Sequence, residues 1–231
     1  MSVDKNLQPT NESPNRYGET EDDIVKHRLF SKDIVTKEHT LYMDALGDHP
    51  LLDELFNTLY TAGGNDTLTI RIDSPGGMLS ELYRFKALIV EKFYGRCTTI
   101  LDPAGASAGA LTFTYGDKRI VYEHSWAMFH DWSGGVWGKA SDIEKSLIFR
   151  RELFKKTFRE DLKDFFTEEE IENMFKGQEF WLDAKELCER KIATHVITKG
   201  KTITAEEYLK QFKTEEKKEV KKLSTTSKKK K

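Results

Sequence analysis

Three strand-like runs alternate with helix-like segments in the first half of the chain, and this order constrains the fold more than any other feature. The runs "HTLYMDAL", "LTIRI" and "CTTIL" occupy residues 39–46, 68–72 and 97–101. Between them, apolar residues at helical spacing predict one helix that ends near Tyr60 and a second from about Leu79 to Phe93. Strands joined by crossover helices lie parallel, with right-handed crossovers. The sequence therefore predicts an α/β domain.

The second half of the chain is expected to add two short strands, "RIVY" and "WAMFH", and then several helices. A long helix is predicted to begin at Ser141, which forms a capping-box pattern with Glu144, and to keep an apolar face for about seven turns. Two further capping-box patterns predict helix starts at Thr167 and Asp183. The stretch "GQEFWL" between them is expected to be a loop or a short strand.

Both ends of the chain differ from its middle. Residues 1–22 are polar, contain two prolines and lack periodicity, which predicts a disordered arm. Residues 213–231 contain nine lysines and three glutamates but no arginine or aromatic residue. A tail of this composition is expected to be disordered and solvated and not to bind nucleic acid. The domain between the two ends is expected to span residues 23–212.

The composition argues against a membrane-spanning or disulfide-stabilised protein. Hydrophobic residues make up 38% of the chain and charged residues 33%. No apolar run approaches the roughly 18–20 residues that cross a bilayer. The N-terminus has no apolar signal core, so we expect a cytoplasmic protein. Cys97 and Cys188 form no metal-ligand or redox pattern, and both are expected to be reduced and buried.

The stretch "DPAGASAGALTFTYG", residues 102–116, places Ser107 between small residues at the junction of a strand and a helix. Small residues at such a junction can simply form a tight turn. They also allow a substrate backbone to approach a serine hydroxyl, and N–H groups at a helix start stabilise an oxyanion. A serine hydroxyl becomes a strong nucleophile only when a base takes its proton. Ser107 is therefore a candidate nucleophile that requires a base.

Three histidines follow Ser107 in the chain. His130 ends the apolar run "WAMF" and precedes "DWSGG", so it is expected at a strand tip beside a glycine loop, where catalytic groups are commonly displayed. His124 is expected at the surface in a polar turn, and His195 is expected in a late strand. Position in the chain therefore makes His130 the candidate base.

A second glycine turn follows the strand "LTIRI", just as the small residues around Ser107 follow "CTTIL". This turn is "DSPGG", residues 73–77. The ends of neighbouring parallel strands lie side by side, and open α/β sheets bind ligands there. Gly76 and Gly77 could therefore present backbone N–H groups beside Ser107.

Four motifs together resemble the Clp protease proteolytic subunit (ClpP) family. They are "IDSPGG", "GASAGA", "AMFHDWSGGVWGKASDIE" and "WLDAKEL", in the order of that family, and the resemblance runs over about residues 41–197. It implies a ClpP/crotonase-like α/β fold of repeated β-β-α units with a protruding handle helix. A strand and a helix at 134–165 resemble this handle.

Carried over by position, the resemblance implies a serine endopeptidase. Ser107 would be the nucleophile, His130 the general base, and the amides of Gly77 and Ala108 the oxyanion hole. No metal or other cofactor is implied. The resemblance further implies a homo-oligomer of two stacked heptameric rings, a chamber in which unfolded polypeptides are cut, and an ATP-driven unfoldase as partner.

The third member of the family's triad is an aspartate, and the alignment of "WLDAKEL" places Glu179 at its position. Glu179 is expected to orient His130, although its additional methylene requires a backbone shift. Asp183 is close enough in sequence to compete for this role. Its predicted role as a helix cap already explains Asp183, so Glu179 is preferred.

Three other interpretations stay open. The pattern Gly-x-Ser-x-Gly also fits the nucleophile elbow of α/β-hydrolases, in which His195 would be the base, although few strands precede Ser107. Glutamate in place of the family aspartate also fits an inactive, structural ring subunit. A phage-type relative that processes capsid proteins would use the same chemistry on another substrate.

Overall fold

The computed structural model of this chain describes residues 35–47, 52–135 and 137–212. The chain divides into two compact units, residues 1–36 and 37–231, and the elements named below all belong to the second unit. The predicted arm at 1–22 and the predicted tail at 213–231 lie outside the described residues. Among the helices that are described, none combines the length and the apolar character needed to cross a bilayer.

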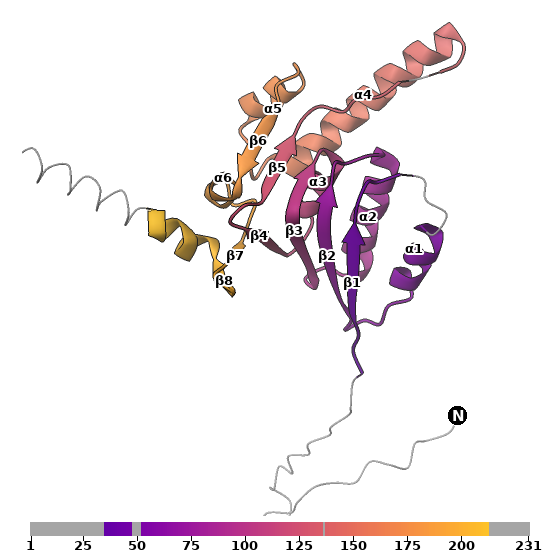
Figure 1. Cartoon of the computed structure of the whole chain (residues 1–231). Coiled ribbons are helices and arrows are strands. Elements are labelled where there is room, and N and C mark those ends of the chain that lie inside the picture. Colours follow the sequence, from indigo (N-terminus) through magenta and orange to yellow (C-terminus); the bar gives the residue numbers. More distant parts are fainter. Residues whose placement is uncertain (1–34, 48–51, 136, 213–231) are drawn as a thin grey trace, which may run out of the picture. The chain divides into compact units, whose positions relative to one another are not determined.

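An eight-stranded sheet forms the centre of the second unit (Figure 1). Its strands are β1 (Glu38–Met43), β2 (Thr67–Ser74), β3 (Cys97–Ala106), β4 (Lys118–Tyr122), β5 (Trp126–Phe129), β6 (Phe180–Asp183), β7 (His195–Thr198) and β8 (Lys201–Thr204). The main path is β1-β2-β3-β4-β7-β8, and it is parallel up to the antiparallel β7–β8 pair. β5 leaves this path, because it pairs parallel with the end of β3 and antiparallel with β6.

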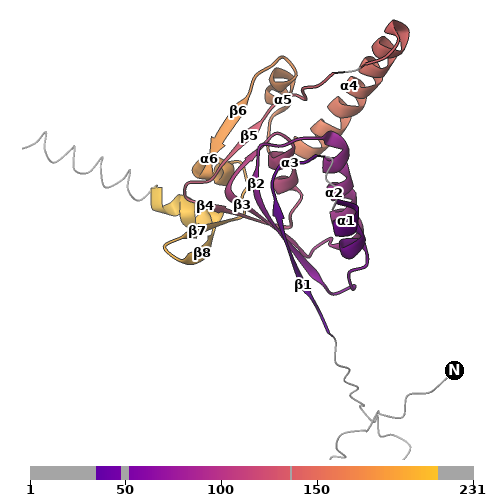
Figure 2. The same cartoon turned by 45° about the vertical axis from the view of Figure 1, so that its right-hand side comes forward.

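Six helices with described bounds accompany the sheet. They are α1 (Leu52–Tyr60), α2 (Leu79–Lys92), α3 (Ala108–Thr114), α4 (Ala140–Leu162), α5 (Glu168–Met174) and α6 (Ala184–Glu189). Residues 205–212 are also helical. Helices α1, α2 and α3 cover one face of the parallel part of the sheet, as Figures 1 and 2 show. The predicted mixed α/β fold is confirmed.

The core lies between β2 and these helices. Leu68, Ile70 and Ile72 are fully buried. They are every second residue of β2, so their side chains share the face of the sheet that the helices cover. Leu82 and Leu88 of α2 are fully buried as well. Burying an aliphatic side chain of this size contributes about 1.5–3 kcal/mol to stability. The apolar spacing in the sequence therefore identified the inward faces of both elements.

Helix α4 is anchored at one end and projects beyond the sheet at the other (Figures 1 and 2). Phe154, Phe158 and Leu162, near its C-terminal end, are buried. Four large apolar side chains nearer its N-terminal end are exposed, namely Leu147, Ile148, Phe149 and Leu153. The protruding helix implied by the family resemblance is thus present.

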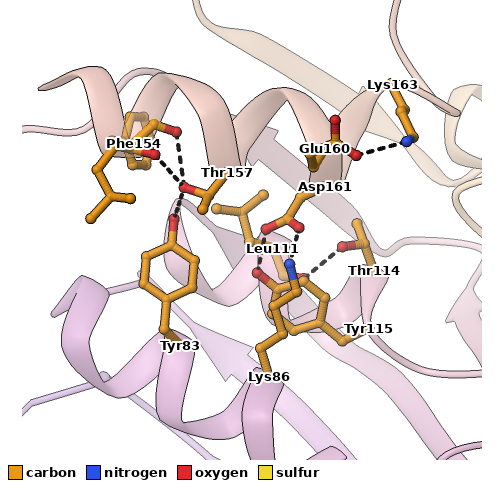
Figure 3. A network of polar contacts seen from close by, with 11 residues as sticks. Tyr83, Lys86, Leu111, Thr114, Tyr115, Phe154, Thr157, Glu160, Asp161 and Lys163 are labelled. Atoms are coloured by element: carbon orange, nitrogen blue, oxygen red, sulfur yellow. Dashed lines mark hydrogen bonds and ion pairs between the residues drawn. The ribbon is translucent and has the colours of Figure 1, made fainter. Parts of the chain in front are cut away.

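Polar contacts fix the anchored end of α4 to α2 and α3 (Figure 3). Tyr115 donates a hydrogen bond to Asp161 at 2.7 Å, and Lys86 pairs with the same carboxylate. A hydroxyl–hydroxyl hydrogen bond of 2.8 Å joins Tyr83 to Thr157. The Asp161 side chain is 3% exposed, and a buried carboxylate without partners would be strongly destabilising. These contacts therefore define where α4 leaves the domain.

The capping box predicted at Ser141 and Glu144 is wrong. Helix α4 begins at Ala140, and its N-cap is Lys139, whose extended backbone makes no side-chain cap. Ser141 lies inside the first turn, so its hydroxyl cannot cap the helix, and it contacts the carboxylate of Asp142 instead. The acidic side chain in the first turn gives this helix start favourable electrostatics without a cap.

The strand expected in the handle is absent from the described residues at 131–135 and 137–139. A strand needs a hydrogen-bonding partner, and two consecutive glycines, Gly134 and Gly135, further weaken this segment as a strand. The long helix ends at Leu162, earlier than predicted. By contrast, the capping boxes at Thr167 and Asp183 are confirmed.

Candidate active site

Ser107 lies between β3 and α3, where it is the N-cap residue of the helix. Its φ of 54° and ψ of −124° belong to a region that residues with a side chain rarely adopt. Such a conformation costs on the order of 1–3 kcal/mol, and strained residues cluster at active sites. The side chain is half-buried. The surrounding structure therefore holds the backbone of Ser107 in a conformation that a serine residue does not adopt by preference.

The two glycines that flank Ser107 are required by packing. A Cβ atom on Gly105 would lie 2.8 Å from Cδ2 of Leu101, and one on Gly109 would lie 2.9 Å from the carbonyl oxygen of Ser74. Both contacts are shorter than carbon atoms tolerate. The tight-turn interpretation therefore explains these glycines, but it does not explain the strained backbone of Ser107.

The glycine turn after β2 lies directly against the Ser107 junction. Gly76 and Gly77 have φ values of 103° and 141°, which favour glycine. A Cβ atom on Gly76 would lie 2.7 Å from the Cβ of Ser107 and 3.1 Å from the backbone nitrogen of Ala108. The ends of the neighbouring strands β2 and β3 thus bring both glycine-rich turns together.

The backbone of Leu46 makes hydrogen bonds that fix this turn, and sequence reasoning missed this contact. Its N–H donates to the carbonyl of Gly76 at 2.8 Å, and its own carbonyl accepts from Met78 at 2.7 Å. A Cβ atom on Gly77 would lie only 1.8 Å from the Leu46 oxygen. Within the described part of the chain, the N–H groups of Gly77 and Ala108 have no acceptor. Both amides are therefore unpaired within the described residues.

His130 follows directly after β5 and is half-buried. Strand β5 runs parallel to the end of β3, with Ala106 opposite Met128. The N–H of Ser107 donates to the carbonyl of Met128 at 2.8 Å. Ser107 and His130 therefore follow the ends of two adjacent parallel strands, and His130 lies at a strand tip as the sequence predicted.

Glu179 directly precedes β6, and Asp183 is its last residue. This strand is antiparallel to β5, and Phe129 pairs with Phe180 at one end while Trp126 pairs with Asp183 at the other. His130 directly follows Phe129 and Glu179 directly precedes Phe180, so the two residues border the same end of the ladder. Asp183 is instead the N-cap of α6, where its carboxylate accepts from the Glu186 N–H at 2.8 Å. The register thus separates the two candidate carboxylates, and Glu179 is the one that borders the end of the ladder next to His130.

The side chains of Ser107, His130 and Glu179 are not joined by hydrogen bonds in the described structure. Glu179 is exposed, and its Oε2 atom accepts a hydrogen bond of 2.9 Å from Nε1 of Trp181. Catalytic hydrogen bonds often tighten only when substrate binds. Sequence reasoning missed Trp181, which lies two residues after Glu179 on the same side of the chain.

A second carboxyl group lies beside His130. Burial raises the pKa of Asp131, while its bond from the Trp132 N–H and the positive charges of Arg151 and Lys155 on α4 act in the opposite direction. Burial has the largest effect, so the pKa of Asp131 lies above its usual range. Among the described residues, no three His, Cys, Asp or Glu side chains converge in a way that could hold a metal ion.

The arrangement of β7 argues against an α/β-hydrolase site. His195 begins β7 opposite Ile120 of β4, which is itself opposite Ile100 in β3. His195 is therefore level with the middle of β3, far from its end at Ser107. Its Nδ1 atom also lies 2.9 Å from the hydroxyl of Thr194.

Comparisons with known proteins agree on one family. A family model described as Clp protease matches residues 23–200. The ATP-dependent Clp protease proteolytic subunit 2 of Mycolicibacterium paratuberculosis is 29% identical over 145 residues, which are 59% of this chain and 69% of the relative. Subunit 1 of Corynebacterium jeikeium is 27% identical over 186 residues, or 76% and 95% of the two chains. Subunit 3 of Rhizobium meliloti is 30% identical over 145 residues, or 59% and 71%.

Proposed function

The chain belongs to the Clp protease family, and from this premise we propose that it is a serine endopeptidase that cleaves unfolded polypeptides in the cytoplasm. Ser107 is the proposed nucleophile, His130 the general base and Glu179 the carboxylate that orients the imidazole. The strand register supports this proposal most strongly. Ser107 and His130 leave adjacent ends of β3 and β5, and β6 carries Glu179 to the same end of β5.

The proposed reaction is acyl transfer through a covalent intermediate. Ser107 Oγ attacks the peptide carbonyl carbon while His130 takes the hydroxyl proton. His130 then gives this proton to the leaving amine, and the C–N bond breaks to leave an ester on Ser107. Water, deprotonated by His130, attacks the ester and releases the second product, which restores the serine.

Two backbone amides are proposed to stabilise the tetrahedral intermediates. The N–H groups of Gly77 and Ala108 border the Ser107 junction, and neither has an acceptor within the described residues. Donors that are fixed in advance cost no reorganisation when charge develops, and losing one such donor costs about 10²- to 10³-fold in turnover. The Leu46 contacts supply this rigidity at Gly77.

An oligomeric chamber forms part of the proposal. The exposed apolar side chains of α4, Leu147, Ile148, Phe149 and Leu153, are between 43% and 68% exposed. Apolar groups that gather on a surface mark interaction sites, and we propose that another copy of the chain covers them in two stacked heptameric rings. The relatives' names describe an ATP-dependent protease, so the proposed partner is an ATP-driven unfoldase.

A second candidate function is that of an inactive ring subunit. It is favoured by glutamate at the position of the family aspartate and by the bond that Glu179 makes to Trp181 in place of His130. In this case the chain would assemble with other subunits but would not hydrolyse peptides.

Labelling with a fluorophosphonate separates the two functions. An active enzyme is expected to react at Ser107 and to lose hydrolysis of a small fluorogenic peptide in proportion to labelling. Ser107→Ala should show neither reaction, and mass spectrometry of the labelled peptide identifies the modified residue. A wild-type protein that assembles but neither labels nor hydrolyses peptide would support the inactive subunit and reject the proposed enzyme.

A further inference from the structure

Two tryptophans lie side by side on the exposed face of the β5–β6 ladder. The ring centroids of Trp126 and Trp181 are 5.2 Å apart with an interplanar angle of 33°. Trp126 is 38% exposed and Trp181 is 57% exposed. Burial of apolar surface therefore does not explain this pair, because much of both rings faces solvent.

The pair and the proposed catalytic groups occupy the same face of the ladder. Along β5, Trp126 and Met128 are less buried than Ala127 and Phe129 between them, and His130 continues the side of Trp126. Along β6, Leu182 is buried and Trp181 is exposed. The same alternation places Glu179 on the side of Trp181.

One polar contact joins the tryptophan pair to Glu179. Trp181 Nε1 donates to Glu179 Oε2 at 2.9 Å. An indole N–H is a donor only, so it pairs with an acceptor oxygen of the carboxylate. The second oxygen, Oε1, has no hydrogen-bond partner within the described part of the chain. One oxygen is thus held while the other stays available on the face that His130 shares.

We infer that Trp181 is a positioning residue for the proposed triad, because its indole N–H holds the Glu179 carboxylate on the side of the ladder that carries His130. Trp126 supports the indole from the neighbouring strand. This inference rests on the proposed peptidase function and extends it.

Because the proposed acid is a glutamate, Glu179, there is a physical reason for a positioning residue such as Trp181. Glutamate has one more rotatable bond than aspartate, so its carboxylate explores more positions and loses more conformational entropy when it is held. A hydrogen bond from the indole N–H of Trp181, whose ring contacts that of Trp126, removes part of this freedom before substrate binds. The bond therefore compensates for the longer side chain.

A double-mutant cycle tests this role. Trp181→Phe keeps an aromatic ring beside Trp126 but removes the N–H donor, and it is measured alone and together with Glu179→Gln. The matched control is Trp137→Phe, at a tryptophan that is 90% exposed and lies in the segment before α4. For each variant, kcat and KM are measured with a small fluorogenic peptide, and the rate of fluorophosphonate labelling at Ser107 is recorded.

We expect Trp181→Phe to lower kcat by about 10-fold without changing KM, and Trp137→Phe to leave both unchanged. In the Glu179→Gln background, Trp181→Phe should cause no further loss, since an amide already fails to orient the imidazole in the correct tautomer and its positioning no longer matters. A variant that loses its fold would instead lose activity in both backgrounds, so the cycle distinguishes positioning from misfolding.

Four results would overturn the inference while leaving the proposed function intact. The first two are an unchanged kcat in Trp181→Phe and an increased kcat, which would mean that the indole withholds Glu179 from His130. The third is an equal loss in both backgrounds, which would indicate damage to the fold, and the fourth is a raised KM, which would indicate direct contact with substrate. A wild-type protein that neither labels nor hydrolyses peptide would instead reject the proposed function, and the positioning role with it.

Discussion

The N–H of Ser107 donates to the carbonyl of Met128 at 2.8 Å, and this bond ties the proposed nucleophile to the strand that carries the proposed base. Met128 precedes His130 by two residues, so a shift of β5 would move the imidazole relative to the serine hydroxyl. The proposed site thus depends on the pairing of β3 with β5 and of β5 with β6. Its geometry is set by strand register more than by any loop.

Replacement of His130 by glutamine should separate chemistry from folding. His130→Gln is expected to lower peptide turnover by about 10⁴- to 10⁶-fold, because glutamine cannot accept the serine proton at neutral pH. The thermal unfolding midpoint should change little, since the side chain of His130 is only half-buried and glutamine is of similar size. His124→Gln, at an exposed position, is the control. Full activity in His130→Gln would remove the histidine from the mechanism.

Gly77→Ala tests the proposed oxyanion hole. The new Cβ would lie 1.8 Å from the Leu46 carbonyl, so the turn must move and take the amide with it. We expect a loss of about 10²- to 10³-fold in kcat. The free energy of unfolding should fall by about 1–3 kcal/mol, because φ at this position is 141°. Turnover and denaturant unfolding measure the two effects.

The matched control for this change is Gly64→Ala, where a Cβ would meet no atom within 4 Å. This variant should keep both activity and stability. If Gly77→Ala also kept full activity, the amide at this position would have no part in stabilising the intermediate.

The sequence was sufficient to predict the elements that depend on local pattern. Alternating apolar residues identified β2, and helical spacing identified α2. The capping boxes at Thr167 and Asp183 depend on residues only three positions apart, and both form as predicted. The approach of Gly76 to Ser107 followed from a general rule of parallel sheets, because two turns after adjacent strands must meet at one edge.

The features that the sequence did not reveal depend on contacts between distant segments. The hydrogen bonds that fix the turn at Gly77 come from Leu46, which lies in a different segment and belongs to no recognisable motif. The pairing of β5 with β6 joins residues about fifty positions apart, and its register cannot be read from either strand alone. The bond between Trp181 and Glu179 follows from side-chain geometry that only the folded strand defines.

The exposed apolar side chains of α4 should control assembly. Phe149→Glu combined with Leu153→Glu places two charges on residues that are 68% and 50% exposed. We expect light scattering to show a large oligomer for the wild type and a much smaller species for this variant, since burying charges at an interface is costly. Val90→Glu, on α2 and 60% exposed, should not change the mass. A wild-type monomer at micromolar concentration would contradict the chamber.

Glu170 should make stability depend on pH in the acid range. Its bonds from Arg190, and then the N–H of Thr167, lower the pKa of this carboxyl from about 4.5 to about 2. A lowered folded-state pKa stabilises the fold above about pH 4.5, and this contribution is lost as the pH falls toward 2. Glu170→Gln should therefore lower the free energy of unfolding by about 1–2 kcal/mol at pH 7. At pH 2 it should match the wild type.

Urea unfolding at several pH values measures this difference, with Glu169→Gln as the control. Glu169 is exposed and lies one residue before Glu170 in the same helix turn. A destabilisation of Glu170→Gln that stayed constant from pH 7 to pH 2 would show that packing, and not charge, gives Glu170 its effect.

The carboxylates at the two ends of β6, Glu179 just before the strand and Asp183 as its last residue, lead to opposite expectations. Glu179→Gln should keep the fold and lower peptide turnover by about 10²- to 10⁴-fold, because an amide orients the imidazole in the wrong tautomer. Asp183→Asn should keep turnover and lower the free energy of unfolding by about 1 kcal/mol or less, since asparagine is also a good N-cap. Asp183 lies opposite Trp126, at the far end of β6 from His130. If Asp183→Asn were the inactive variant, the register of β5 and β6 would have to differ in the active enzyme. If both variants kept full turnover while Ser107→Ala lost it, His130 would be acting without either acid.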